Sequence, residues 1–65
     1  MAVINTNNFR FIRLPNVLAK VGLSKSQLYK LIGEGKFPPQ VKLSTRAVAW
    51  VEQQVDEWMI QRAPT

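Results

Sequence analysis

Hydrophobic residues near the start of the chain recur at a helical spacing. They follow the i, i+3, i+4, i+7 pattern of a single helix face at Leu14, Val17, Leu18 and Val21. Pro15 suits the first turn of a helix, where its missing amide costs nothing, and Gly22 suits a left-handed C-terminal cap. The pattern therefore predicts a helix over residues 15–21, which is too short to be stable alone.

A second helix is predicted directly after Ser24. Its hydroxyl can accept a hydrogen bond from an amide of the first turn, and Gln27 can complete a capping box. The hydrophobic side of this helix consists of Leu28, Leu31 and Ile32. Gly33 weakens the end of the helix, and Pro38 and Pro39 prevent its continuation.

Only three residues separate the two predicted helices, namely Gly22, Leu23 and Ser24. A turn this short that contains a glycine makes the helices cross steeply, as helix-turn-helix units require. Leu23 is expected to fill the angle between the two helices.

The second half of the chain predicts a β-hairpin and a third helix. Strand-like runs at residues 41–43 and 47–50 flank a polar turn at residues 44–46. Residues 51–62 then predict a helix whose hydrophobic side contains Val51, Val55, Trp58 and Met59. Phe37 is expected to pack between the second helix and the hairpin.

Together these elements predict a mainly α-helical fold with a small β-hairpin. We interpret residues 9–65 as a single winged helix-turn-helix domain with three short helices and a two-stranded wing. The polar residues 1–8 are expected to form a flexible N-terminal segment, and residues 9–13 suit either a short strand or an extended lead-in. Trp50 and Trp58 are candidate base-stacking platforms, but their hydrophobic surroundings favour a place in the core.

The net charge of +5 is unevenly distributed. Residues 10–46 contain eight basic residues and one acid, whereas residues 51–65 contain three acids and one arginine. The basic body implies a negatively charged partner such as nucleic acid. The acidic side of the last helix is expected to meet the basic side of a neighbouring copy or a recombinase.

Composition disfavours catalysis and metal binding. The chain has no cysteine and no histidine, so a zinc ion would have only carboxylate ligands, and the usual nucleophile and base pairs are missing. We therefore expect no enzymatic activity, no cofactor, no metal and no small-molecule substrate. The N-terminus lacks the apolar run of a signal peptide or membrane span, and the lack of cysteine fits the cytoplasm.

The outward side of the second predicted helix carries hydrogen-bonding groups suited to DNA. These candidates are Ser24, Lys25, Ser26, Gln27, Tyr29 and Lys30. Lysine can bond to guanine or phosphate, the other side chains can bond to bases or phosphates, and Ser24 stands where free helix amides can hold a phosphate. Alternatively, Lys25 and Lys30 form an ordinary solvated face. The Tyr29 ring can instead pack against the turn, and Gln27 can serve only as a cap.

The predicted hairpin adds a second group of candidates. Lys42, Thr45 and Arg46 stand at or beside its polar turn. A wing of this kind can lie along the DNA backbone, and an arginine can enter a narrow minor groove. The alternative is a polar turn with a solvated arginine.

A set of short motifs resembles a known family. It comprises Arg13-Leu14-Pro15, Gly22-Leu23-Ser24-Lys25-Ser26, Leu28-Tyr29, Gly35-Lys36-Phe37-Pro38, Val41-Lys42-Leu43, Arg46-Ala47-Val48, Trp50 and Trp58. In this order the motifs resemble the AlpA family of small prophage regulators, which are similar to phage excisionases and to the DNA-binding half of MerR proteins. The resemblance implies a winged helix whose second helix enters the major groove and whose hairpin contacts the minor groove.

The expected function is sequence-specific binding of double-stranded DNA. The resemblance implies a phage or prophage regulator that activates transcription near an integrase gene or acts as a directionality factor in excision. It also implies a bacterial cytoplasmic protein, associated with the nucleoid when bound, with an integrase or further copies on adjacent sites as protein partners. The alternative is a protein-interaction module that docks a regulator or recombinase without specific DNA binding.

Overall fold

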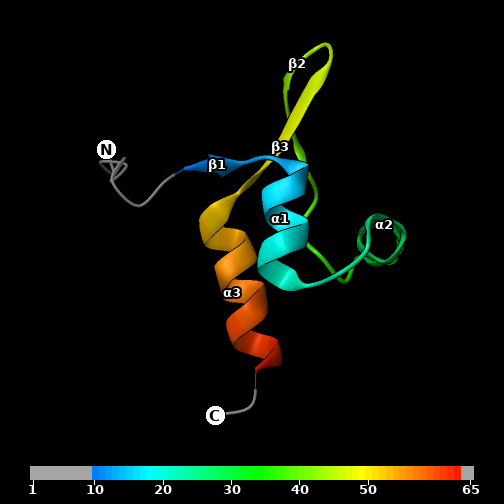
Figure 1. The fold of residues 1–65 in the computed structure, drawn as a ribbon, viewed down its shortest axis with the longest axis vertical. Coiled ribbons are helices and arrows are strands. Elements are labelled where there is room, and N and C mark those ends of the chain that lie inside the picture. The colour runs from blue at the N-terminus through cyan, green and yellow to red at the C-terminus, as the bar shows by residue number, and fades with distance from the viewer. Residues whose placement is uncertain (1–9, 64–65) are drawn as a thin grey trace.

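Three helices and a projecting hairpin form the fold of residues 10–63, the part of the chain that the computed structural model describes. The elements in chain order are β1 (Phe11–Ile12), α1 (Leu14–Val21), α2 (Lys25–Gly33), β2 (Val41–Ser44), β3 (Ala47–Val51) and α3 (Glu52–Arg62). Figure 1 shows α1 and α3 side by side, with α2 on the other side of α1. The expected mainly helical fold with a hairpin is confirmed, and the segment 1–8 lies outside the described residues.

The turn between α1 and α2 has the conformation that its sequence predicts. Gly22 ends α1 in the left-handed region with φ 74°, and its amide donates a 2.8 Å hydrogen bond to the Leu18 carbonyl oxygen. Because a side chain is strained at this φ, glycine is the residue best suited to the position. The cap stops α1 and lets the chain turn into α2 within three residues.

A complete capping box starts α2. The backbone N–H of Gln27 donates to Ser24 Oγ over 3.2 Å, and the backbone N–H of Ser24 donates to Gln27 Oε1 over 3.0 Å. These two bonds satisfy amides that have no partner within the helix. The predicted start of α2 is therefore confirmed by the reciprocal pair.

The sheet has three strands in the order β1-β3-β2, all antiparallel. The segment that suited either a strand or an extended lead-in is a two-residue strand, in which Phe11 pairs with Val51 and Ile12 with Trp50. The sheet is therefore one strand larger than the predicted two-stranded wing. A strand this short is defined by its partner some 40 residues away, so its own hydrophobic pattern could not identify it.

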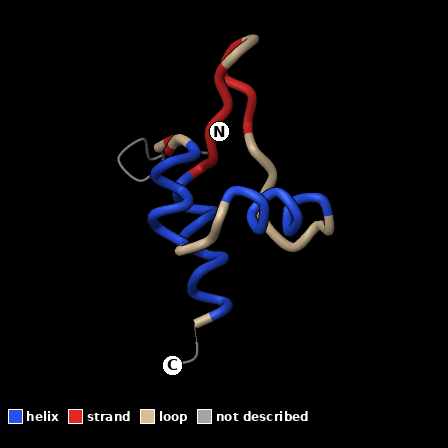
Figure 2. The backbone as a smooth tube through the Cα atoms, turned by 45° about the vertical axis from the view of Figure 1, so that its right-hand side comes forward, coloured by secondary structure: helices blue, strands red, loops and turns tan. Residues whose placement is uncertain are grey.

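The hairpin extends beyond the helices as a wing, as Figure 2 shows. Its register pairs Val41 with Ala49, Lys42 with Val48 and Ser44 with Ala47, so Leu43 is an extra residue on β2. The strands are joined by a turn at residues 45–46, and β3 continues directly into α3 at Val51. The wing follows α2 as expected, and its first strand carries an irregularity.

The core lies where the helices meet β3. Its buried members are Val17, Leu28, Phe37, Trp50 and Val55. Trp50 is fully buried, so its predicted place in the core is confirmed, and Phe37, expected between the second helix and the hairpin, is 5% exposed in the same cluster. Trp58 packs against this core but is only partly buried. It lies at the rim of the core, where its indole N–H donates to a loop carbonyl.

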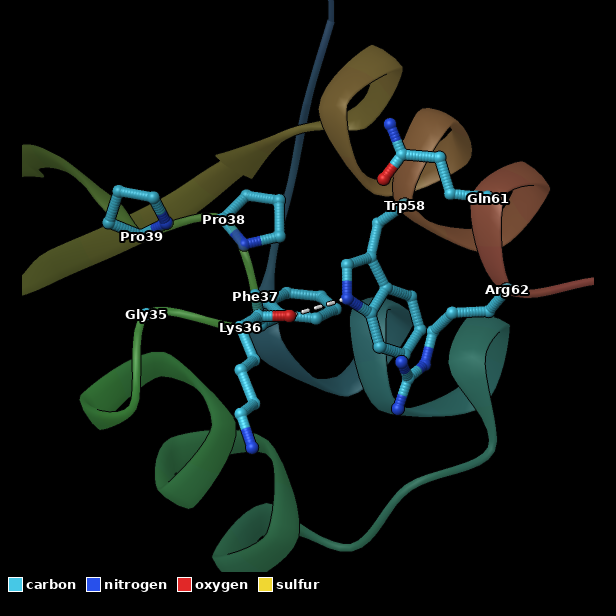
Figure 3. A pocket seen from close by; sticks show the side chains of 8 residues that line it. All are labelled: Gly35, Lys36, Phe37, Pro38, Pro39, Trp58, Gln61 and Arg62. Carbon is cyan, nitrogen blue, oxygen red and sulfur yellow. Dashed lines mark hydrogen bonds between the residues drawn. The ribbon is translucent and has the colours of Figure 1, made fainter.

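Two tryptophans hold the loop that links α2 to the wing. Trp58 Nε1 donates a 2.7 Å hydrogen bond to the Lys36 carbonyl oxygen, and Trp50 Nε1 donates a 3.1 Å bond to the Pro38 carbonyl oxygen. Phe37 is the residue between Lys36 and Pro38 in the chain. Its ring lies edge to face with that of Trp58, with 4.8 Å between the ring centroids (Figure 3). The loop is thereby fixed to both β3 and α3.

Candidate nucleic-acid interface

The outward side of α2 presents most of the predicted site residues to solvent. The exposed members are Ser24, Lys25, Ser26, Gln27 and Lys30. Leu28, on the other side of the helix, is fully buried in the core. Ser26 and Lys30 share a face because they are four residues apart, whereas Ser24, Lys25 and Gln27 are exposed at the N-cap and in the first turn of the helix. Both lysines of the helix are therefore accessible to a partner.

The lysines of this face have no acidic partner within the described chain. No carboxylate of residues 10–63 lies within 4.0 Å of the ammonium group of Lys25 or Lys30. The acid nearest in sequence, Glu34, instead lies 3.7 Å from the Lys36 ammonium group. Uncompensated positive charge thus collects on α2, as a surface that binds phosphates requires.

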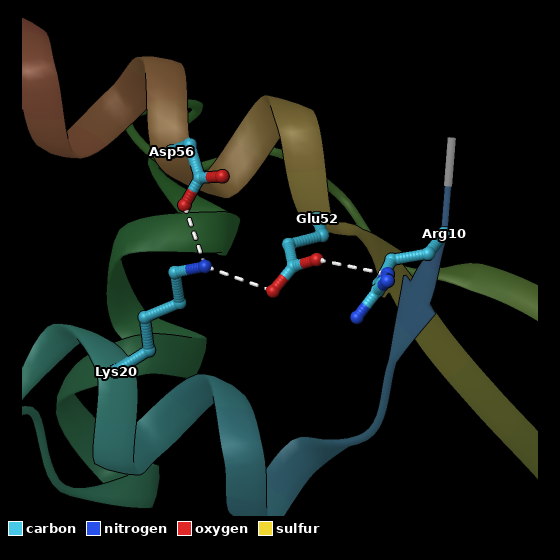
Figure 4. A network of polar contacts seen from close by, with 4 residues as sticks. All are labelled: Arg10, Lys20, Glu52 and Asp56. Atoms are coloured by element: carbon cyan, nitrogen blue, oxygen red, sulfur yellow. Dashed lines mark hydrogen bonds and ion pairs between the residues drawn. The ribbon is translucent and has the colours of Figure 1, made fainter. Parts of the chain in front are cut away.

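A different set of charges ties α1 to α3 (Figure 4). Lys20 Nζ lies 2.6 Å from Asp56 Oδ1 and 2.9 Å from Glu52 Oε2, and Arg10 Nε lies 3.5 Å from Glu52 Oε1. The hydrogen bonds to Asp56 and Glu52 raise the pKa of Lys20 above its ordinary value. Within the described residues, Glu57 is the one acid of α3 outside these pairs. The acidic side expected to meet a partner is therefore largely occupied within the molecule.

Two of the predicted α2 residues also have structural roles. The Tyr29 ring lies edge to face with Trp50 at 6.4 Å between centroids and is partly buried, so it packs against the sheet. This contact differs from the expected alternative, in which the ring would pack on the turn. Gln27 uses its amide oxygen in the capping box. Contact of either side chain with DNA stays a prediction.

The wing presents its three predicted residues separately from α2. Lys42, Thr45 and Arg46 are all exposed, on β2 and at its turn. In the chain from residue 10 to residue 63, neither Lys42 nor Arg46 forms an ion pair within 4.0 Å. The structure therefore gathers the site residues into two exposed groups, one on α2 and one on the wing.

A hollow lies beside the loop that joins these two groups. It has a volume of about 630 Å³ and is lined by Gly35, Lys36, Phe37, Pro38, Pro39, Trp58, Gln61 and Arg62 (Figure 3). The Arg62 guanidinium carbon lies 4.6 Å from the centre of the Trp58 ring, which is a cation–π distance. The backbone carbonyl of Lys36 accepts the Trp58 hydrogen bond. This role was not predicted from the sequence, because every residue type has such a carbonyl.

Side chains able to bind a metal are scattered over the described part of the chain. No group of three or more histidine, cysteine, aspartate or glutamate side chains is placed to hold a metal ion within residues 10–63. None of the described helices has the length and hydrophobicity needed to cross a membrane.

The short turn, the capped second helix and the hairpin behind it define a winged helix-turn-helix protein. The family model of the prophage CP4-57 regulatory protein (AlpA) matches residues 10–63. The chain belongs to this AlpA family of prophage regulatory proteins, as the motifs in its sequence indicated.

Two known proteins are similar to the chain over most of its length. It is 49% identical over 53 residues to the uncharacterized protein ORF88 of enterobacteria phage P4, an alignment that covers 82% of this chain and 60% of that protein. It is 31% identical over 64 residues to the DNA-binding transcriptional activator AlpA of Escherichia coli strain K12, covering 89% of this chain and 91% of the relative. The chain therefore corresponds to nearly the whole of the bacterial relative and to three fifths of the phage protein.

Proposed function

We propose that this protein binds double-stranded DNA sequence-specifically, with α2 in the major groove and the wing in the minor groove. The observation that carries the proposal is the exposed face of α2, where Lys25 and Lys30 have no acidic partner among residues 10–63. An unpaired cationic helix face is favourable beside phosphates, because binding there releases condensed counterions.

The side chains of α2 suit both backbone and base contacts. Lys25 and Lys30 can reach guanine O6 and N7 or phosphate oxygens, and the hydroxyl of Ser26 can donate to either. Ser24 Oγ accepts its capping bond but keeps a hydroxyl hydrogen to donate to a phosphate at the start of the helix. In this arrangement the lysines supply most of the affinity.

The wing supplies the second contact of the proposed complex. Lys42 and Thr45 are exposed beside Arg46, and arginine is favoured in a narrow minor groove because the negative potential is strongest there. The loop held by Trp50 and Trp58 fixes the position of the wing relative to α2. Contacts in two neighbouring grooves would then come from a single rigid body.

The biological role that we propose is regulation of a prophage or related element. The Escherichia coli relative is a DNA-binding transcriptional activator, which supports a role in transcriptional activation. A directionality factor in excision would use the same surface. A role of this kind also implies binding of further copies to adjacent sites, or of an integrase, in the bacterial cytoplasm where the DNA lies.

A selection experiment tests the proposal and identifies the target site in the same step. Random duplexes retained by the protein are amplified over several rounds, and the enriched duplex is titrated by mobility shift against unrelated competitor DNA. We expect one enriched motif, bound at least about a thousandfold more tightly than random DNA. Retention without a motif, with equal affinity for every duplex, would favour the alternative of a protein-interaction module.

A further inference from the structure

One exposed hydrophobic residue stands on the wing. Leu43 is 44% exposed and lies outside the core cluster of the described residues. It occupies the β-bulge of the hairpin, because the register passes from Lys42 opposite Val48 to Ser44 opposite Ala47. The extra residue therefore has no partner across the ladder.

The bulge affects the direction of the Leu43 side chain. A bulge breaks the strict alternation of a strand, and such irregularities often re-aim a side chain next to a functional site. A hairpin that needed only to project into solvent would be served by polar residues, as it is at Ser44 and Thr45. The leucine therefore lies at an irregular, exposed point of the wing, directly before its polar turn.

The charges around Leu43 favour DNA as its partner. The exposed Lys42 and Arg46 flank it, and no acidic residue occurs in the sequence between Glu34 and Glu52. The minor groove has the complementary arrangement, with anionic phosphate rims around walls formed by the carbon atoms of the sugars. Proteins that bind this groove insert leucine and similar apolar side chains between its walls or base steps.

We propose that Leu43 is a DNA-contacting residue, packing against the sugars and base edges of the minor groove while Lys42 and Arg46 meet the adjacent phosphates. The inference rests on the proposed function and adds an apolar contact to a wing whose other proposed contacts are electrostatic. A neutral contact of this kind adds affinity without releasing counterions.

The test compares full-length variants on the duplex that the unmodified protein selects. Leu43→Ser should bind about three to ten times more weakly. The loss is modest because part of the leucine side chain is already covered in the free protein, and DNA buries only the rest. The slope of log affinity against log salt concentration should stay unchanged. Leu43→Met should bind nearly as tightly as the unmodified protein, because it keeps the apolar volume.

Ile60→Ser is the matched control, because Ile60 on α3 is 68% exposed and lies on another element. It should bind DNA like the unmodified protein. Circular dichroism melting checks each fold, with Leu43→Ala as the second variant if the serine disturbs the hairpin. Unchanged affinity of folded Leu43→Ser and Leu43→Ala, or a loss accompanied by a flatter salt slope, would overturn the inference. Failure of the unmodified protein to select a motif would instead overturn the proposed function.

Discussion

Trp58 Nε1 donates a 2.7 Å hydrogen bond to the Lys36 carbonyl oxygen, which joins α3 to the loop between α2 and the wing. The same loop receives a second indole hydrogen bond from Trp50 at Pro38. Two indole rings from elements later in the chain therefore hold the loop that links the two proposed DNA contacts.

Removing the Trp58 donor while keeping an aromatic ring should loosen this loop. Trp58→Phe is expected to lower the free energy of unfolding by about 1 kcal/mol, the usual contribution of one hydrogen bond. Urea denaturation followed by the fluorescence of Trp50 measures the change. Trp58→Ala should cost more, about 3 kcal/mol, at the low end for a tryptophan because the ring is partly exposed. If the alanine variant were fully stable and failed only in DNA binding, Trp58 would belong to the interface.

The two lysines of α2 should dominate the electrostatic part of DNA binding. The double variant Lys25→Ala/Lys30→Ala is expected to weaken binding and to flatten the slope of log affinity against log salt by up to about 2 units, one per lost phosphate contact. Fluorescence anisotropy over a range of salt concentrations gives this slope. Arg62→Gln, at the end of α3, is the control and should leave it unchanged. An unaltered slope in the lysine variant would mean that α2 does not face DNA.

Ser24 allows its capping role to be separated from its proposed phosphate contact. Ser24→Ala should lower the free energy of unfolding by about 1 kcal/mol, because the Gln27 amide loses its acceptor. Ser24→Asp should preserve stability, since aspartate also caps helices and its charge favours the helix N-terminus. The aspartate variant should nevertheless bind DNA poorly, because it would repel the phosphate. Denaturation and mobility-shift titrations of both variants decide the point, and tight binding by Ser24→Asp would exclude a phosphate at this position.

The ion pairs of Lys20 should make stability depend on pH in the alkaline range. Asp56 and Glu52 raise the pKa of Lys20 in the folded protein above its ordinary value of 10.5. The folded state therefore holds this proton more tightly, so the contribution of Lys20 is complete below that pH and is lost as pH rises through the folded pKa. Urea unfolding of the unmodified protein and Lys20→Met is compared from pH 7 to pH 11. The stability difference should shrink above about pH 10.5, and a difference that grew there would contradict the assignment.

Local sequence was informative wherever an interaction spans four residues or fewer. The left-handed Gly22 cap, the reciprocal bonds of Ser24 with Gln27, and the inward turn of Leu28 all depend on neighbours along the helix. The same local geometry predicted that Lys25 and Lys30 would be exposed. The α2 half of the candidate site could therefore be located without coordinates.

The sequence by itself determined the helices, their caps, the short turn and the existence of a hairpin, because these depend on residue spacing and on bonds between near neighbours. Only the tertiary structure decided that β1 pairs with β3, that Trp58 holds Lys36, and that Lys20 pairs with Asp56. It also decided that Leu43 occupies a bulge. Each of these depends on the arrangement of the folded backbone, since partners distant in the chain meet only after the core has brought their elements together.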